Sequence, residues 1–425
     1  MTALVVVAFV ASYVLIATER IHRLAAALWG AAAMVVLGVA DSGSAFFSED
    51  TGIDWNVIFL LLGMMIIVGV VRQTGVFEFI AIWSAKRAGG RPFRVLAMLV
   101  VLTATASALL DNVTTVLLVA PVTLLVCERL GTPAVPFLLA EAMASNIGGT
   151  ATLIGDPPNI IIAGRSGLTF NDFAANLAPI VVVLLGLFLV LAWFLWGRRM
   201  RTDPERAASL VELNEREAIE DPRLLVICGI VLALVMAGFL LRPLIGIEPS
   251  IVALLGAGLL VALSRVEPDV YLSEVEWPTL VFFAALFVMV GGLVRSGVIA
   301  SVGQWATSAM GDNLFLGHTI LLFGSGVLSG IVDNIPYVAT MSPLVDQVVS
   351  ATGDPSLWWS LALGADLGGN ATAVGASANV VILGIAARNG MRISFWQFTR
   401  YGLVVTAVTL VVSWVYVTFR YVVGA

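Results

Sequence analysis

The chain of 425 residues has very little sulfur and almost no imidazole. Its two cysteines, Cys127 and Cys228, lie far apart in the sequence, so we expect neither a disulfide framework nor a site of three thiolates. The two histidines, His22 and His318, are equally isolated, and no zinc or haem spacing is present. We therefore expect no metal and no cofactor. We also find no nucleophile–base constellation, so an enzyme is not expected.

Charge is also scarce. Only 12% of the residues are charged and 60% are hydrophobic, and one long apolar segment follows another. A soluble protein of this length cannot bury so much apolar surface, whereas a bilayer accepts it as helices of about 20 residues. We expect an all-α polytopic protein of the cell (inner or plasma) membrane, with the lipid bilayer and no nucleic acid as partner. Because the first apolar run lacks a basic n-region, we interpret it as a membrane helix and not as a cleavable signal peptide.

The apolar runs and their interruptions predict segments of several kinds. Continuous membrane helices are predicted near residues 2–18, 24–40, 56–71, 174–197, 224–241, 250–264, 278–294 and 400–419. Interrupted helices are predicted near 134–165 and 356–387, and re-entrant hairpins near 93–128 and 314–349. Short amphipathic helices along the membrane interface are predicted at 76–87 and 298–310.

The distribution of basic residues supports the two hairpins. With hairpins at these places, 18 of the 22 Lys and Arg residues fall on one side of the membrane, which is the bias expected of the cytoplasmic side. Only Arg165, Arg242, Arg295 and Arg420 fall on the other side. A single crossing at 93–128 would instead place the basic cluster of 198–223 outside. Each half then crosses about five times, an odd number, so the two halves form inverted repeats.

A polar signature occurs twice in the chain, about 220 residues apart. The segment DNVTTVLLVAP at 111–121 corresponds to DNIPYVATMSP at 333–343, and NIGGTATLIGDPPN at 146–159 corresponds to DLGGNATAVGASAN at 366–379. A membrane tolerates irregular backbone only where it is buried in protein or lines a wet cavity. We therefore predict unwound breaks at mid-membrane in both Gly-Gly segments. The two hairpin tips and the two breaks are expected to meet at one site on a pseudo-twofold axis.

The predicted substrate or ion site consists of polar and glycine residues of these four segments. They are Asp111, Asn112, Thr114, Asn146, Gly148, Thr150, Thr152, Asp156, Asn159, Asp333, Asn334, Asp366, Asn370, Thr372 and Asn379. The alternative for the glycines is that they only allow close helix packing. For the acids, the alternative is that hydroxyl and backbone groups satisfy them.

The intramembrane acids are also candidates for proton coupling. Asp111 and Asp333 are the predicted proton carriers, because burial favours the neutral form of a carboxyl and no basic partner is expected in the core. Glu141, Asp156 and Asp366 are further candidates. A pocket with several acids and no Arg or Lys repels dicarboxylates and tricarboxylates unless cations enter with them. It suits a cation, or a neutral solute that is exchanged for protons, although helix N-termini could still accept an anion.

The segments ALLDNVTTVLLVAPV, ASNIGGTATLIGDPPN and SGIVDNIPYVATMSP closely resemble the ion transporter superfamily, and within it the arsenite permease and melanosomal P-protein branch. The resemblance spans nearly the whole chain. It implies a secondary transporter that exports arsenite or antimonite, as As(OH)3 or Sb(OH)3, in exchange for protons. It further implies an elevator-type movement and a homodimer, in which a scaffold domain holds a mobile transport domain.

The resemblance also implies a division of the chain into domains. The first repeat would be residues 1–197 (scaffold 1–87, transport 88–197), followed by a cytoplasmic linker at 198–223 and a second repeat at 224–425 (scaffold 224–312, transport 313–425). Some arsenite permeases use an ATPase subunit, so such a partner stays an open alternative. The chain itself has no P-loop, and nothing in 198–223 indicates such a contact.

Two related branches supply alternatives for the cargo. In the sodium–dicarboxylate branch each hairpin tip carries Ser-Asn-Thr; the matching residues here are Asp111, Asn112, Val113 and Asp333, Asn334, Ile335. The asparagines are kept, but the serines and threonines are not, so we do not expect the sodium and carboxylate sites of that branch to carry over. The sodium/proton antiporter branch has Asp-Asn tips. Two alternatives therefore stay open: sodium/proton exchange, with Na⁺ as a coupling ion beside H⁺, and symport of an organic anion. An ion channel is a third alternative.

Overall fold

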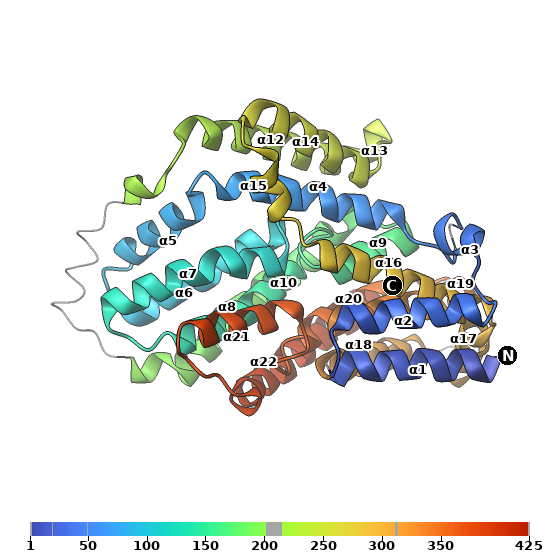
Figure 1. Cartoon of the computed structure of the whole chain (residues 1–425). Coiled ribbons are helices and arrows are strands. Elements are labelled where there is room, and N and C mark those ends of the chain that lie inside the picture. The colour runs from blue at the N-terminus through green and yellow to red at the C-terminus, as the bar shows by residue number, and fades with distance from the viewer. Residues whose placement is uncertain (1, 19, 49, 201–214, 311–312, 424–425) are drawn as a thin grey trace.

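The structure is a computed structural model that describes residues 2–18, 20–48, 50–200, 215–310 and 313–423. The described residues form helices joined by turns and loops, with no β-strand among them (Figure 1). The first half contains α1 (Thr2–Thr18), α2 (Arg23–Val36), α3 (Ser42–Phe46), α4 (Trp55–Arg72), α5 (Val76–Arg87), α6 (Pro92–Leu109), α7 (Asn112–Leu130), α8 (Val135–Gly149), α9 (Pro157–Ser166) and α10 (Phe170–Leu195). Two short 3-10 segments follow, η1 (Gly197–Arg199) and η2 (Glu215–Ala218).

The second half repeats this order of elements. It contains α12 (Pro222–Leu240), α13 (Arg242–Ile245), α14 (Pro249–Ser264), α15 (Pro268–Ser273), α16 (Trp277–Arg295), α17 (Val298–Met310), α18 (Leu314–Ile331), α19 (Asn334–Thr352), α20 (Leu357–Gly368), α21 (Ser377–Arg388), α22 (Phe395–Val417) and the π-helical turn η3 (Thr418–Val422). In Figure 1, α4 lies beside α14 and α2 lies beside α16. The predicted scaffold segments of the two halves therefore pack on one another.

The polytopic all-α class is confirmed. Among the described residues, helices long and apolar enough to cross a membrane occur at Trp55–Arg72, Pro92–Leu109, Asn112–Leu130, Phe170–Arg199, Pro222–Leu240, Trp277–Arg295, Leu314–Ile331 and Phe395–Val422. The helices α1, α2, α14 and α21 are apolar but shorter. The α2 helix ends at Val36, before the predicted position 40, because Gly38 adopts a positive φ of 72° that stops a right-handed helix.

Each predicted hairpin is a pair of helices joined at an Asp-Asn tip. The α6 helix meets α7 at Leu110–Asp111, and α18 meets α19 at Val332–Asp333. The two short helices predicted before the hairpins are present as α5 and α17, and their position along the membrane interface stays a prediction. Each of these short helices directly precedes a hairpin, as the repeat predicts.

Matching hydrogen bonds hold each hairpin to the interrupted helix of its own half. In the first half, the Ser107 hydroxyl donates to the Ser145 carbonyl (2.7 Å). In the second half, the Ser329 hydroxyl donates to the Ala365 carbonyl (2.5 Å). Close backbone contact accompanies these bonds, because a Cβ on Gly148 would lie only 2.1 Å from the carbonyl oxygen of Ala104.

The two interrupted helices have the predicted breaks. The α8 helix ends at Gly149 and α9 begins at Pro157, whereas α20 ends at Gly368 and α21 begins at Ser377. One asparagine side chain closes each break: the Asn159 amide donates to the Thr152 carbonyl (3.1 Å), and the Asn379 amide donates to the Thr372 carbonyl (2.9 Å). Carbonyls that no longer belong to a helix are thus satisfied without water.

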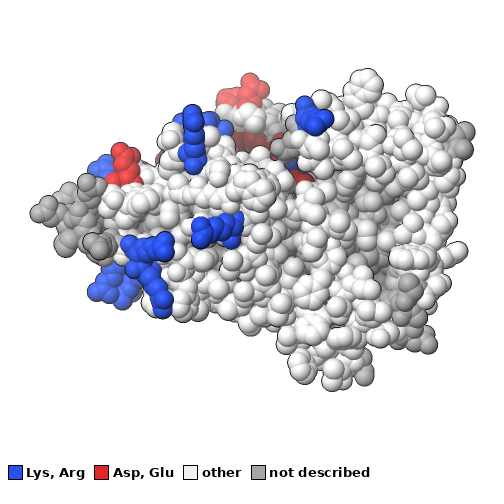
Figure 2. All heavy atoms as spheres, turned by 90° about the horizontal axis from the view of Figure 1, so that it is seen from below, with Lys and Arg blue, Asp and Glu red and all other residues white. Residues whose placement is uncertain are grey.

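The predicted linker at 198–223 lies partly outside the described residues. Where the chain resumes, the Glu220 amide donates to the Thr74 carbonyl (3.2 Å), so the end of the linker contacts the junction of α4 and α5. On the face shown in Figure 2, Lys and Arg gather toward one end and most of the face is uncharged. The division into scaffold and transport domains, and the cytoplasmic position of the linker, stay predictions.

Candidate functional site

Side-chain hydrogen bonds join both hairpins and both interrupted helices into one buried group. Its members, which we call the central cluster, are Asn112, Asn146, Asp156, Asn334, Asn370 and Asn379. None of the six is more than 2% exposed. The helices α7, α9, α19 and α21 all begin at this cluster. Because a helix N-terminus carries partial positive charge, four helix starts favour negative charge at the cluster, none of whose six members is Lys or Arg.

Asp156 joins the two hairpin tips. Its Oδ2 accepts a hydrogen bond from the amide of Asn112 (3.0 Å) and another from the amide of Asn334 (3.3 Å). Asp156 belongs to the first half and Asn334 to the second, so this carboxyl connects the two repeats. At the offset that relates the Gly-Gly segments, the position of Asp156 is occupied by Ala376 in the second copy. The site therefore has only an approximate twofold symmetry.

Asn146 continues the network toward the second interrupted helix. Its Oδ1 accepts from Asn112 (3.0 Å), and its amide donates to Asn370 Oδ1 (2.9 Å) and to Asn379 Oδ1 (3.2 Å). The Asn370 amide in turn donates to the carbonyl of Met143 (3.3 Å). This chain of amides fixes α8 and α20 relative to one another at the cluster.

Asp366 occupies the position of Asn146 in the second copy, and its surroundings are very different. It is fully buried, and neither carboxyl oxygen has a hydrogen-bond partner among the described residues. Thr150 and Asn159 face this carboxyl from the first half. A buried carboxylate without partners costs several kcal/mol, so the group must hold a proton, receive a hydrogen bond from Thr150 or Asn159, or receive a donor or a cation from outside the chain.

The two tip aspartates cap helices and have unequal partners. Asp111 accepts from the backbone amide of Thr114 (2.8 Å) and from the Thr114 hydroxyl. Asp333 accepts from the backbone amide of Ile335 (3.0 Å), from the Ser377 hydroxyl (2.8 Å) and from the Arg23 guanidinium (3.2 Å). The expectation that no basic partner reaches the buried acids is therefore wrong for Asp333. The start of α2 carries Arg23 to the tip of the second hairpin.

The remaining predicted residues lie around the cluster or away from it. Thr152 and Thr372 donate to the carbonyls of Ala108 (2.5 Å) and Gly330 (2.6 Å), and Thr150 donates to the carbonyl of Asn146 (2.8 Å). The hydroxyls of these threonines therefore donate to backbone carbonyls and not to side chains of the central cluster.

Glu141 is buried elsewhere. It accepts a hydrogen bond from Thr123, a residue 11 positions beyond the hairpin tip, which corresponds to roughly 16 Å along α7. Glu141 Oε2 has no partner among the described residues. Glu141 therefore lies apart from the central cluster and has no hydrogen bond to it among the described residues.

Sequence reasoning missed Arg23 and Ser377. Ser377 stands where the first copy has Pro157, and this difference between the copies was a usable signal. Arg23 gave no signal, because it lies 310 residues from Asp333 and only the folded chain brings the two together.

Comparison with known proteins identifies the family of this chain. The family model CitMHS, described as a citrate transporter, matches residues 13–364. The chain is 56% identical to the uncharacterized transporter Rv2685 of Mycobacterium tuberculosis over 99% of both chains. It is 33% identical to the P protein of Sus scrofa over 97% of this chain and 58% of that protein. The solved structure of the Alcanivorax borkumensis YdaH transporter matches with a TM-score of 0.59 at 17% identity, over 86% of this chain and 85% of that one, which shows a shared fold.

The resemblance to the ion transporter superfamily is thereby confirmed. The matched region contains the whole first polar signature and the second hairpin tip. The chain belongs to the CitMHS citrate transporter family of the ion transporter superfamily and is a multi-pass membrane transporter.

Proposed function

We propose that this chain is a proton-coupled secondary transporter that exports arsenite or antimonite as the neutral hydroxides As(OH)3 and Sb(OH)3. The observation that supports it most is the contrast between two buried carboxyls. Asp156 accepts hydrogen bonds from both hairpins, whereas Asp366 has no partner among the described residues. Coupling is therefore assigned to Asp156 and Asp366 in preference to the tip residues Asp111 and Asp333, which are used as helix caps.

Exchange of a solute for a proton requires that the two compete for one site. When Asp366 is protonated, its carboxyl carries no charge, and Asp156 keeps the hydrogen bonds from the amides of Asn112 and Asn334. When Asp366 loses its proton, the carboxylate needs a donor, and a hydroxyl of the solute can supply one. The proton and the solute then stabilise the same carboxyl in turn. This alternation is the physical basis of exchange.

The available ligands suit a neutral hydroxide. As(OH)3 offers three O–H donors, and the site has buried acceptor atoms without partners among the described residues: Asn159 Oδ1, which faces the Asp366 carboxyl, and Asn112 Oδ1 at the first hairpin tip. A thiolate site is not available, because Cys127 and Cys228 lie on different helices, α7 and α12. Arsenite would therefore be held by oxygen atoms.

The movement that we propose is of the elevator type. All six residues of the central cluster lie in the predicted transport segments 88–197 and 313–425. The Arg23–Asp333 ion pair, in contrast, joins a predicted scaffold helix to a transport hairpin. A moving transport domain would carry the cluster with it and would have to break this ion pair. A homodimer built on the scaffold segments is part of the same proposal.

Symport of an organic anion such as citrate is the second candidate. Two observations favour it: the description of the matching family, and the four helix N-termini that converge on the cluster. A tricarboxylate could bind only if protons or Na⁺ neutralised Asp156 and Asp366. Sodium/proton exchange would use the same carboxyl and amide oxygens.

The test is transport by the purified chain in proteoliposomes. With an imposed pH gradient, we expect arsenite accumulation against its own gradient, with release of protons reported by a trapped pH dye. Asp156→Asn and Asp366→Asn should each reduce the coupled flux by about tenfold or more, which is at least about 1.4 kcal/mol of coupling. Asp269→Asn, an exposed acid on α15, is the matched control and should behave like the unaltered chain.

The same vesicles separate the alternatives. Citrate uptake that requires Na⁺ or H⁺, without arsenite flux, would overturn the proposed arsenite substrate and would support symport of an organic anion. A pH change inside the vesicles that requires Na⁺ and not arsenite, reported by the trapped dye, would support sodium/proton exchange. Coupled arsenite flux that persists in the double variant Asp156→Asn and Asp366→Asn would overturn the mechanism.

A further inference from the structure

An apolar pocket lies against the second hairpin, away from the central cluster. Its walls come from α17, α18, α19 and the start of α20, and its volume is about 260 Å³. We propose that this pocket, the α17–α18 pocket, binds one acyl chain of a membrane lipid. The proposal concerns lipid binding and does not depend on which solute is carried.

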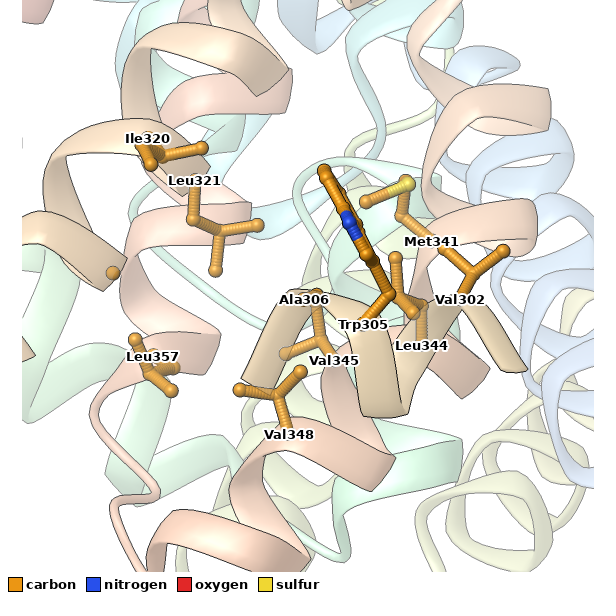
Figure 3. Close-up of a pocket in the computed structure, with 11 residues that line it drawn as sticks. Val302, Trp305, Ala306, Ile320, Leu321, Met341, Leu344, Val345, Val348 and Leu357 are labelled. Atoms are coloured by element: carbon orange, nitrogen blue, oxygen red, sulfur yellow. The ribbon is translucent and has the colours of Figure 1, made fainter. Parts of the chain in front are cut away.

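The side chains of the lining offer a single polar group, the indole N–H of Trp305. Figure 3 shows Ile320 and Leu321 on one side of the pocket and Trp305 and Met341 on the other. Leu357 lies at the start of α20. Apart from the indole N–H of Trp305, the lining side chains are hydrocarbon or thioether, so dispersion contacts with a hydrocarbon chain are the only attraction they can offer.

The pocket opens on a surface that faces lipid. The α18 helix is long and apolar enough to span a membrane, and its outer side chains Ile320, Val327 and Ile331 are each about 60% exposed. Ile320 belongs both to this exposed stripe and to the pocket. Trp305 is 72% exposed on the amphipathic helix α17, a position typical of an aromatic anchor at the membrane interface. The medium next to the opening is therefore the hydrocarbon of the bilayer.

Two wall positions of the pocket have larger side chains in the first half. Counting back from the Gly-Gly pair, Leu357 corresponds to Phe137, which is 1% exposed. Counting back from the hairpin tip, Gly317 of the lining corresponds to Val95, which is fully buried. At these two positions the second half has the smaller side chains beside the pocket. An unfilled cavity loses dispersion contacts along its lining, so an acyl chain that enters from the bilayer restores them.

Photolabelling tests the proposal on the full chain. The probe is a phosphatidylcholine with a diazirine in the middle of one acyl chain, titrated at low mole fraction into protein-containing micelles. We expect saturable labelling on peptides of α17 and α18. Leu357→Phe, which copies the first half, and Ala306→Phe, which fills the pocket from α17, should each weaken the apparent affinity by about tenfold. Val327→Phe, on the same exposed stripe but outside the pocket, should leave labelling unchanged.

Two results would overturn the proposal. Labelling that does not saturate, and that spreads equally over the exposed faces of α10 and α18, would mean ordinary annular lipid. A disulfide between two copies of an Ile320→Cys variant would mean that a second copy of the chain covers the pocket. Leu357→Phe and Ala306→Phe alter different walls of the pocket, so if one variant does not fold, the other still tests the proposal. A folded variant is identified by a single peak in size-exclusion chromatography.

Discussion

At the scale of single residues, the two aspartates of the Gly-Gly segments have opposite environments. Asp156 has amide donors from both hairpins, and Asp366 has no partner among the described residues. Hydrogen bonds to a charged group stabilise by about 1.5–3 kcal/mol, whereas an unpaired buried charge destabilises. Neutral substitutions at the two positions should therefore have opposite effects on stability.

We predict that Asp156→Asn lowers the stability of the purified chain by about 1.5–3 kcal/mol, because the amides of Asn112 and Asn334 lose a charged acceptor. Asp366→Asn should change stability by less than about 1 kcal/mol or increase it, because no bond is lost. Thermal unfolding of the detergent-solubilised protein measures both, with Asp269→Asn as the control. Equal destabilisation by the two substitutions would contradict the assignment.

The Arg23–Asp333 ion pair should contribute a measurable interaction energy. The side chains are 31% and 14% exposed, and the Ser377 hydroxyl is shared between them. A double-mutant cycle with Arg23→Met and Asp333→Asn should give a coupling of about 1 kcal/mol in thermal unfolding. The Arg295–Asp41 pair, separated by 3.9 Å and more exposed, is the control and should show no coupling. Equal couplings for the two pairs would argue against a specific contact between α2 and the hairpin tip.

At the scale of helices, close backbone contact joins each hairpin to its interrupted helix. A Cβ on Gly368 would lie 2.5 Å from the carbonyl oxygen of Gly326, and the equivalent contact of Gly148 with Ala104 is closer still. In both places the neighbour is backbone, which cannot rotate away as a flexible side chain can. The glycines of the signature therefore have a packing role in addition to any role in the break.

We predict that Gly148→Ala and Gly368→Ala each destabilise the chain by about 1–3 kcal/mol and reduce transport, because the hairpin must move away from α8 or α20. Gly186→Ala is the matched control. A Cβ added at Gly186 on α10 would have nothing within 4 Å, and alanine should stabilise this helix by up to about 1 kcal/mol. Thermal unfolding and vesicle transport measure the two effects. A tolerated alanine at both Gly148 and Gly368 would contradict the packing role.

At the scale of the whole molecule, contacts agree with the predicted sidedness of the loops. The Arg72–Glu274 pair joins two segments predicted on the cytoplasmic side, and the Arg295–Asp41 pair joins two segments predicted outside. Neither pair connects opposite sides. The positive-inside distribution and the tertiary contacts are thus consistent with one orientation.

This orientation predicts the accessibility of engineered cysteines. Leu244→Cys, at an 82% exposed position of α13, should react with a membrane-impermeant maleimide on intact cells. Arg223→Cys, exposed at the start of α12, should react only after permeabilisation. The native Cys127 and Cys228 are buried and provide a low background. The reverse labelling pattern would invert the orientation and place the linker outside.

Much of the fold could be predicted because its signals are local. Long apolar runs predicted the spans, and the Asp-Asn and Gly-Gly segments predicted the hairpin tips and the breaks to within a few residues. A helix in lipid must satisfy its own backbone, so length and hydrophobicity nearly specify it. The repeat also predicted that the four polar segments meet, and the bonds of Asp156 with Asn112 and Asn334 and of Asn146 with Asn370 join them.

By itself, the sequence determined the membrane class, the repeated order of elements and the set of polar residues available to a site. Only the tertiary structure decided which acids have partners: Arg23 reaches Asp333, both hairpins reach Asp156, and Asp366 is left without a partner among the described residues. The physical reason is that hydrogen bonds and ion pairs act over a few ångströms, between residues that are 44 to 310 positions apart in the chain. The local sequence pattern does not specify which of these distant side chains come into contact.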